Sequence, residues 1–82
     1  MRVLTTGNQL KAARALAGFD QNTLADRAGV NVNTIRNMES KAGNTLTSGV
    51  DIVKKVQSVL EAAGIEFLNH GRPGVRLASP QE

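Results

Sequence analysis

Apolar residues follow a helical period through most of the chain, and this period changes near the end of the sequence. From residue 6 to residue 63 they recur three and four positions apart, which predicts helices over about 6–17, 21–28, 32–39 and 48–63. Beyond residue 63, apolar residues alternate with polar ones on both sides of a turn-rich segment, NHGRPG. This alternation predicts a short β-hairpin within residues 64–79, so we expect a mainly α fold of four to five helices with a C-terminal β-hairpin.

The first predicted helix has a start and a stop signal. Thr6 and Gln9 have the spacing of a capping box, in which the side chain of each residue bonds the backbone N–H of the other. Gly18 ends the helix, because glycine enters the left-handed conformation without a Cβ penalty. One face of this helix combines apolar residues with a charged one: Leu10, Ala13, Arg14 and Ala17.

The segment from residue 20 to residue 39, DQNTLADRAGVNVNTIRNME, predicts two short helices joined by a tight turn. The first starts at Asp20, whose side chain can accept a backbone N–H of the first turn. Phe19 precedes this cap and is spaced to pack against Leu24 as a hydrophobic staple. Gly29 ends the helix in the left-handed conformation.

The second of these helices repeats the same start eleven residues later. Asn31 stands at the N-cap position, and Val30 is spaced to pack against Ile35. The helix continues to about Glu39. Two such starts so close together predict a compact helical pair held at a fixed angle.

A longer apolar helix follows a linker over residues 41–46. Ser48 and Asp51 have capping-box spacing and predict its start, and Gly64 predicts its end, with Ile65 folding back onto it. Its broad apolar face contains Ile52, Val53, Val56, Val59, Leu60 and Ala63, with Val50 beside it.

Several of these positions together resemble one family. Leu24-Ala25, Ala28-Gly29-Val30, Ile35 and Glu39 resemble the pattern of lambda-repressor-like (Cro/repressor, XRE-type) transcriptional regulators. The resemblance covers residues 6–41. It implies a helix-turn-helix DNA-binding domain over residues 6–63, in which residues 32–39 form the helix that reads DNA.

The resemblance also implies roles for residues outside the reading helix. Gln21 stands one residue after the helix cap, where family members use a glutamine to hold a DNA phosphate. Arg14 and Glu39 occupy the positions of an ion pair that ties the first helix to the end of the reading helix. A charge on an apolar face requires a partner when it is buried, and a solvated arginine is the alternative.

On the predicted reading helix, Ile35 and Met38 share one face, and the opposite face is mostly polar. Asparagine can bond adenine through N6 and N7, arginine can bond guanine through O6 and N7, and a valine methyl can contact the thymine methyl. The expected base-reading residues are Val32, Asn33, Arg36 and Asn37. The expected contacts to the DNA backbone are Gln21, Asn31, Thr34, Ser40, Lys41 and Asn44. Val32 departs from the family, in which a polar base-reading side chain is common. Any solvated helix also has a polar face, so the face alone does not decide.

Composition and charge are consistent with one small α-helical domain. The chain has 82 residues, no cysteine and only two aromatic residues, so its stability depends on aliphatic packing without disulfides. The net charge is +3, and the excess lies in residues 1–41, which hold six Lys and Arg against three Asp and Glu, as a phosphate-facing surface requires. Residues 1–5 are expected to form an arm, in which Arg2 is free to touch a DNA phosphate or the minor groove, although a frayed terminus is the more common alternative. Residues 80–82 are expected to form a tail.

We expect neither catalysis nor a cofactor or metal site. The sequence has no cysteine, and its one histidine, His70, lies in a predicted turn as a solvated side chain. GRPG lacks the spacing of a phosphate-binding loop. No apolar run is long enough for a signal peptide or a membrane span, so we expect a cytoplasmic protein without membrane contact.

The leading hypothesis is a sequence-specific transcriptional regulator of double-stranded DNA, a repressor that binds a palindromic operator as a homodimer. One alternative is a DNA-binding antitoxin with a protein partner, and another is a protein-interaction module without DNA. The dimer is expected to form through the electrically neutral second half, at Val50, Val59, Phe67 and Leu77. Alternatively, the last helix and the hairpin complete the core of one monomer, and dimers form only on DNA.

Overall fold

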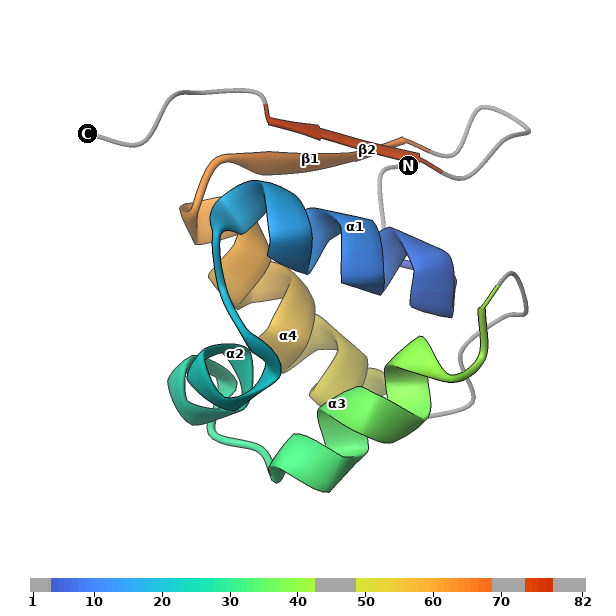
Figure 1. Ribbon diagram of the computed structural model, residues 1–82, viewed down its shortest axis with the longest axis vertical. Coiled ribbons are helices and arrows are strands. Elements are labelled where there is room, and N and C mark those ends of the chain that lie inside the picture. The colour runs from blue at the N-terminus through green and yellow to red at the C-terminus, as the bar shows by residue number, and fades with distance from the viewer. Residues whose placement is uncertain (1–3, 43–48, 69–73, 78–82) are drawn as a thin grey trace.

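A computed structural model of the chain describes residues 4–42, 49–68 and 74–77. Within these ranges the protein is mainly helical, with four helices followed by a two-stranded antiparallel hairpin (Figure 1). The elements are α1 (Gly7–Ala17), α2 (Gln21–Ala28), α3 (Val32–Glu39), α4 (Val50–Ala62), β1 (Ile65–Leu68) and β2 (Gly74–Leu77). No helix of the described residues is long and apolar enough to cross a membrane.

The first three helices begin at the predicted caps. At α1, the Thr6 hydroxyl accepts the Gln9 backbone N–H at 3.2 Å, and the Gln9 side chain accepts the Thr6 N–H at 3.0 Å, which completes the capping box. At α2, the Asp20 carboxylate accepts the Thr23 N–H at 2.7 Å. At α3, the Asn31 side chain accepts the Asn33 N–H at 2.8 Å.

Glycines end α1 and α2 as predicted. Gly18 and Gly29 have φ of 79° and 69°, in the left-handed region where a Cβ would be strained. Their neighbours Phe19 and Val30, the predicted staple residues, are partly buried against the core. The turn between α2 and α3 is therefore fixed by a glycine conformation on one side and an asparagine cap on the other.

The start of α4 differs from the prediction. The helix begins at Val50 rather than at residue 48, and its N-cap is Gly49, which offers no side-chain hydrogen bond. Asp51 therefore stands at the second helical position instead of the third, so it is not placed to form the capping box that its spacing from Ser48 suggested. After the helix, Gly64 has φ of 94° and Ile65 is buried, as predicted.

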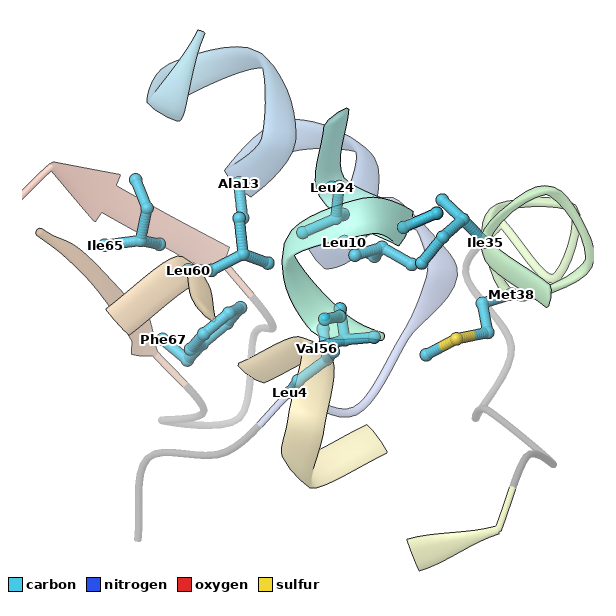
Figure 2. Close-up of a cluster of buried hydrophobic side chains, with 12 residues drawn as sticks. Leu4, Leu10, Ala13, Leu24, Ile35, Met38, Val56, Leu60, Ile65 and Phe67 are labelled. Carbon is cyan, nitrogen blue, oxygen red and sulfur yellow. The ribbon is translucent and has the colours of Figure 1, made fainter. Parts of the chain in front are cut away.

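One cluster of buried side chains joins all four helices to the hairpin (Figure 2). The apolar face of α1 contributes Leu10 and Ala13, and α4 contributes Val56 and Leu60. The whole cluster comprises Leu4, Leu10, Ala13, Leu24, Ala25, Ala28, Ile35, Met38, Val56, Leu60, Ile65 and Phe67. Aliphatic side chains thus supply most of the core, because Phe67 is its only fully buried aromatic residue among those described.

The described part of the predicted N-terminal arm is fixed to the helices. Leu4 is only 4% exposed, and its backbone N–H donates to Gln57 Oε1 on α4 at 3.0 Å. The Thr5 N–H donates to Gln9 Oε1 at 2.8 Å. Leu4 therefore belongs to the core rather than to an arm, while Arg2 lies outside the described residues.

The hairpin completes the core of the monomer. β1 packs on α1 and α4, β2 packs on α1, and the strands pair in the register Ile65 with Leu77 and Phe67 with Val75. Phe67 is completely buried, which corrects the expectation that it contributes to a dimer surface. The alternation of apolar and polar residues located the strands correctly. It did not indicate whether α1 and α4 or a second subunit would cover the apolar face of the hairpin that contains Ile65 and Phe67.

The buried Gln9 side chain connects the hairpin to the start of α1. Its Nε2 donates to the carbonyl oxygens of Leu68 and Gly74, both at 3.2 Å, while its Oε1 serves the capping box. Figure 1 shows the hairpin at one end of the longest axis and α3 at the other. α1 and α4 lie between these two ends (Figure 1), and the molecule measures 31 × 28 × 19 Å along its principal axes.

Candidate nucleic-acid interface

The α2–α3 pair is held together by buried small and aliphatic residues. Leu24 and Ala25 of α2 and Ile35 of α3 are buried, and the two helices contact each other directly. The Val30 N–H donates to the Ala25 carbonyl at 3.0 Å, which closes the turn over the end of α2. In Figure 1, α2 is seen nearly end-on while α3 runs across the view, so the helices cross at a steep angle.

The two faces of α3 are as different as the helical period predicts. Ile35 and Met38 are at most 1% exposed and point from α3 into the core (Figure 2). Asn33, Arg36 and Asn37 are exposed. The exposed face therefore presents two amides and one guanidinium from a helix whose other face is fixed.

Local hydrogen bonds order this exposed face. Arg36 Nη1 donates to Asn33 Oδ1 at 3.1 Å, so these two side chains form a pair across one turn. The Ser40 hydroxyl donates to the Asn37 carbonyl at 2.6 Å. Asn37 itself is exposed.

Val32 is placed differently from the prediction. It is partly buried and packs against the core, and it lines a groove between α2 and α3 with Val30 and Asn22. The first residue of a helix after its cap lies close to the preceding turn, so its side chain packs there. Val32 is therefore less available to a ligand than Asn33, Arg36 and Asn37.

A network of side-chain hydrogen bonds joins α1, α2 and α3. Arg14 Nε donates to Glu39 Oε2 at 2.7 Å, and Arg14 Nη2 donates to Glu39 Oε1 at 3.2 Å. The Arg14 and Glu39 side chains are 18% and 7% exposed. The predicted ion pair is therefore present, in bidentate geometry and largely shielded from water.

Two further contacts extend this network to the start of α2. Arg14 Nη1 donates to the Phe19 carbonyl at 3.1 Å, immediately before the α2 cap. Gln21 Nε2 donates to Glu39 Oε1 at 3.1 Å. The sequence indicated a phosphate contact for Gln21 through the family resemblance, but it gave no signal for this bond to Glu39.

The start of α1 packs closely against the end of α3. A Cβ at Gly7 would stand 2.5 Å from the Met38 carbonyl oxygen and 2.8 Å from the Ala42 nitrogen. The Asn8 N–H donates to the Ala42 carbonyl at 2.8 Å. Sequence reasoning missed this contact because nothing near Gly7 in the sequence indicates which backbone will approach it.

The expected backbone-contact residues surround the exposed face of α3 and the start of α2. Asn31 and Ser40 are exposed, while Gln21, Thr34 and Lys41 are partly buried. Asn44 lies outside the described residues. At the α2 start, hydrogen bonds from the Thr23 backbone and then from its side chain hold the pKa of Asp20 below its ordinary value of 3.8.

The residues expected at a dimer surface do not form one patch. Val50, at the start of α4, is 70% exposed, and Leu77, on β2, is 42% exposed. Val59 is partly buried in a groove with Phe19 and Arg27, whose guanidinium carbon lies 5.0 Å from the centroid of the Phe19 ring. The structure therefore separates these expected interface residues, and Phe67 is not on the surface.

Comparison with known proteins does not assign the chain to a family, since no family model and no curated protein matches it.

Proposed function

We propose that the protein is a sequence-specific, double-stranded DNA-binding transcriptional regulator of the lambda-repressor-like helix-turn-helix type. One observation carries this proposal: a short helix, fixed by its buried face at a steep angle to the preceding helix, exposes Asn33, Arg36 and Asn37 together. The major groove admits an α-helix, and amide and guanidinium groups are the side chains that bond adenine and guanine edges there.

The surroundings of α3 support the same function. Lys41 and Ser40 follow the exposed face, and Gln21 stands at the first position of α2, where the helix dipole favours a phosphate. The bidentate Arg14–Glu39 pair holds the end of α3 against α1. Hydrogen bonds from Lys41, Ser40 and Gln21 to phosphates would position the protein on the DNA backbone, while the exposed face of α3 would read the bases.

We further propose that two copies bind a palindromic operator and repress transcription there. One helix of this length reads only a few base pairs, and a two-fold pair of such helices reads two half-sites about 34–36 Å apart. A genome offers so many competing sites that the added half-site determines whether the regulator finds its own.

Selection of binding sites from random duplexes with the purified protein tests the proposal. We expect enrichment of one sequence with two inverted half-sites, and affinity for it that falls steeply between about 50 and 200 mM salt. An exposed cation on α3 and one on α4 provide a matched pair of variants. Arg36→Ala should reduce affinity and relax the preference at one base pair, whereas Lys55→Ala, which removes the same charge elsewhere, should change little.

Failure to enrich any duplex, together with binding that does not depend on salt, would refute the DNA-binding proposal. A protein-interaction module would then be the better description of the same helices. Enrichment of a duplex only when a second protein is added would instead favour the antitoxin alternative.

A further inference from the structure

The Glu39 carboxylate accepts hydrogen bonds from two other elements at once. Its Oε2 accepts Arg14 Nε, and its Oε1 accepts both Arg14 Nη2 and Gln21 Nε2. Arg14 comes from α1, Gln21 from the first position of α2, and Glu39 from the last position of α3. The carboxylate is 7% exposed, so water competes weakly for its oxygens.

A carboxylate in this position fixes the orientation of the Gln21 amide. An ionised carboxylate only accepts hydrogen bonds, so the NH₂ group of Gln21 must face it. The reversed amide would place two oxygen atoms against each other at the distance where Nε2 and Oε1 now lie, 3.1 Å apart. One Nε2 proton is thereby bound to Glu39, and the second has no partner among the described residues.

We infer that Glu39 is a positioning residue for DNA binding, which acts by presenting the second Nε2 proton of Gln21 to a DNA phosphate. The inference rests on the proposed function. A phosphate oxygen accepts hydrogen bonds, so it can bond Gln21 only through its NH₂ group. Without Glu39 the amide of the free protein can turn, so DNA binding would have to fix its orientation at a cost in affinity.

The role of Arg14 in this arrangement is electrostatic as well as structural. A bare carboxylate beside the DNA backbone would repel phosphates, and the bidentate guanidinium neutralises it. Arg14 also donates to the Phe19 carbonyl at 3.1 Å, which holds the segment entering α2 in place. Glu39 can therefore orient Gln21 with little repulsion of the DNA.

The substitution Glu39→Asp separates positioning from charge. It keeps the negative charge and leaves a carboxylate for Arg14, but the shorter side chain withdraws from Gln21. We expect affinity to fall about three- to tenfold, equally for the selected operator and for an unrelated duplex, because a backbone contact reads no sequence. In a Gln21→Ala background the same substitution should have almost no effect on affinity.

Glu39→Met provides a test by sign, because it removes both the charge and the oxygen that accepts the Gln21 N–H. Loss of a negative charge alone strengthens binding to a polyanion. If Glu39 positions Gln21, affinity should be lower in Glu39→Met than in wild type, and this loss should disappear in the Gln21→Ala background. Glu61→Asp is the matched control, because Glu61 accepts the Gln57 amide at 3.2 Å on the exposed side of α4, and it should leave DNA affinity unchanged.

A measurement on the free protein tests the orientation of the Gln21 amide directly. Its outcome does not depend on DNA affinity or on which operator the protein binds. In the nitrogen–proton spectrum of the free protein, the side-chain amide of Gln21 is the signal pair that Gln21→Ala removes. We expect its two protons to have well-separated shifts that move together when Glu39 becomes Asp, while the Gln57 amide does not move. Melting curves establish that each variant is folded at the temperature of measurement.

The outcomes distinguish this inference from the proposed function. Wild-type protein that binds no duplex overturns the proposed function and the positioning role with it. Wild-type binding combined with equal losses from Glu39→Asp in both backgrounds overturns only the positioning role, because the loss would then be structural. An unchanged Gln21 amide signal in Glu39→Asp would overturn it without DNA.

Discussion

At the residue scale, two ion pairs with the same chemistry have very different surroundings. Arg14–Glu39 is largely shielded, with side chains 18% and 7% exposed, whereas Arg76–Glu66 on the hairpin is 61% and 25% exposed. Removing one partner of a shielded pair leaves a charge that water cannot fully solvate. Exposed pairs contribute little because water and salt replace them.

We therefore predict that Glu39→Ala lowers the free energy of unfolding by about 3 kcal/mol. The matched variant Glu66→Ala should lower it by less than about 1 kcal/mol. Urea denaturation of the two variants and the wild type measures the difference. Equal small effects would mean that the Arg14–Glu39 pair is solvated in the protein.

Gly7 allows a second prediction at this scale. A methyl group there would overlap the Met38 carbonyl, which belongs to the backbone and cannot move aside cheaply. Gly7→Ala should therefore destabilise the protein by about 1–3 kcal/mol, although alanine is the better helix former. Gly49→Ala, which meets nothing within 4 Å, should change stability by less than about 0.5 kcal/mol. Thermal unfolding distinguishes them, and a stabilised Gly7→Ala variant would contradict the close approach.

Arg14, Gly7 and Gln9 show what a sequence reveals about single positions. The partner of Arg14 was predictable, because a charge on an apolar helix face requires one and the family resemblance indicated Glu39. The requirement for glycine at position 7 was not, because it arises from α3, more than 30 residues away in the sequence. Gln9 was half predictable: its capping bond is local, but its bonds to the hairpin are not.

At the scale of elements, local chemistry determined which boundaries were predictable. α2 and α3 begin and end at the predicted residues, because each has a polar cap and the α2 stop is a glycine. The α4 start was misplaced by two residues, because its true cap, Gly49, carries no side-chain signal. The exposed face of α3 followed from the helical period, except at Val32, which the neighbouring turn partly covers.

The cap of α2 predicts a dependence on pH. The folded-state pKa of Asp20 is lowered, so its contribution to stability is present above the ordinary value of 3.8 and is lost as pH falls through the lower folded value. Asp20→Asn keeps a good cap but cannot titrate. We expect wild type to lose stability more steeply than Asp20→Asn below about pH 5. Parallel stability curves over this range would show that the cap does not sense pH.

The exposed face of α3 predicts two classes of DNA-binding variant. Asn33→Ala and Asn37→Ala should each weaken operator binding by about 1–3 kcal/mol and relax the preference at one base pair. Gln21→Ala should weaken binding to all duplexes about equally, since it contacts the backbone. Titrations against the operator and its single-mismatch derivatives separate the two classes. Equal losses on every duplex for Asn37→Ala would remove its base-reading role.

At the scale of the whole molecule, the position of the hairpin restricts how two copies can share one operator. The hairpin and α3 lie at opposite ends of the longest axis (Figure 1). The buried residues of α3, Ile35 and Met38, face the core, and its exposed residues lie on the other side of the helix. A two-fold dimer that stacked its hairpins face to face would hold its α3 helices at the far ends, facing apart. Such a stacked dimer cannot place both helices on one side of one duplex. A hairpin-mediated pair on the proposed palindrome would therefore have to form through the edge of a strand, side by side, and not through the outer face of the sheet.

The hairpin also cannot be deleted to test its role, because Ile65 and Phe67 are part of the core. The exposed residues Val50 and Leu77 offer a cleaner comparison. Val50 starts α4 at the α3 end of the molecule, whereas Leu77 lies on the hairpin at the other end (Figure 1). Aspartate is tolerated at both, since Val50 is 70% exposed at a helix N-terminus and Leu77 is 42% exposed on an outer strand.

We predict that Val50→Asp weakens binding to the complete operator about tenfold or more and leaves binding to an isolated half-site unchanged, because it separates two copies that meet beside α3. Leu77→Asp should change neither affinity by more than about twofold. Sedimentation of each variant on both duplexes gives the stoichiometry, and titration gives the cooperativity. If Leu77→Asp abolished cooperative binding instead, the hairpin would be the interface.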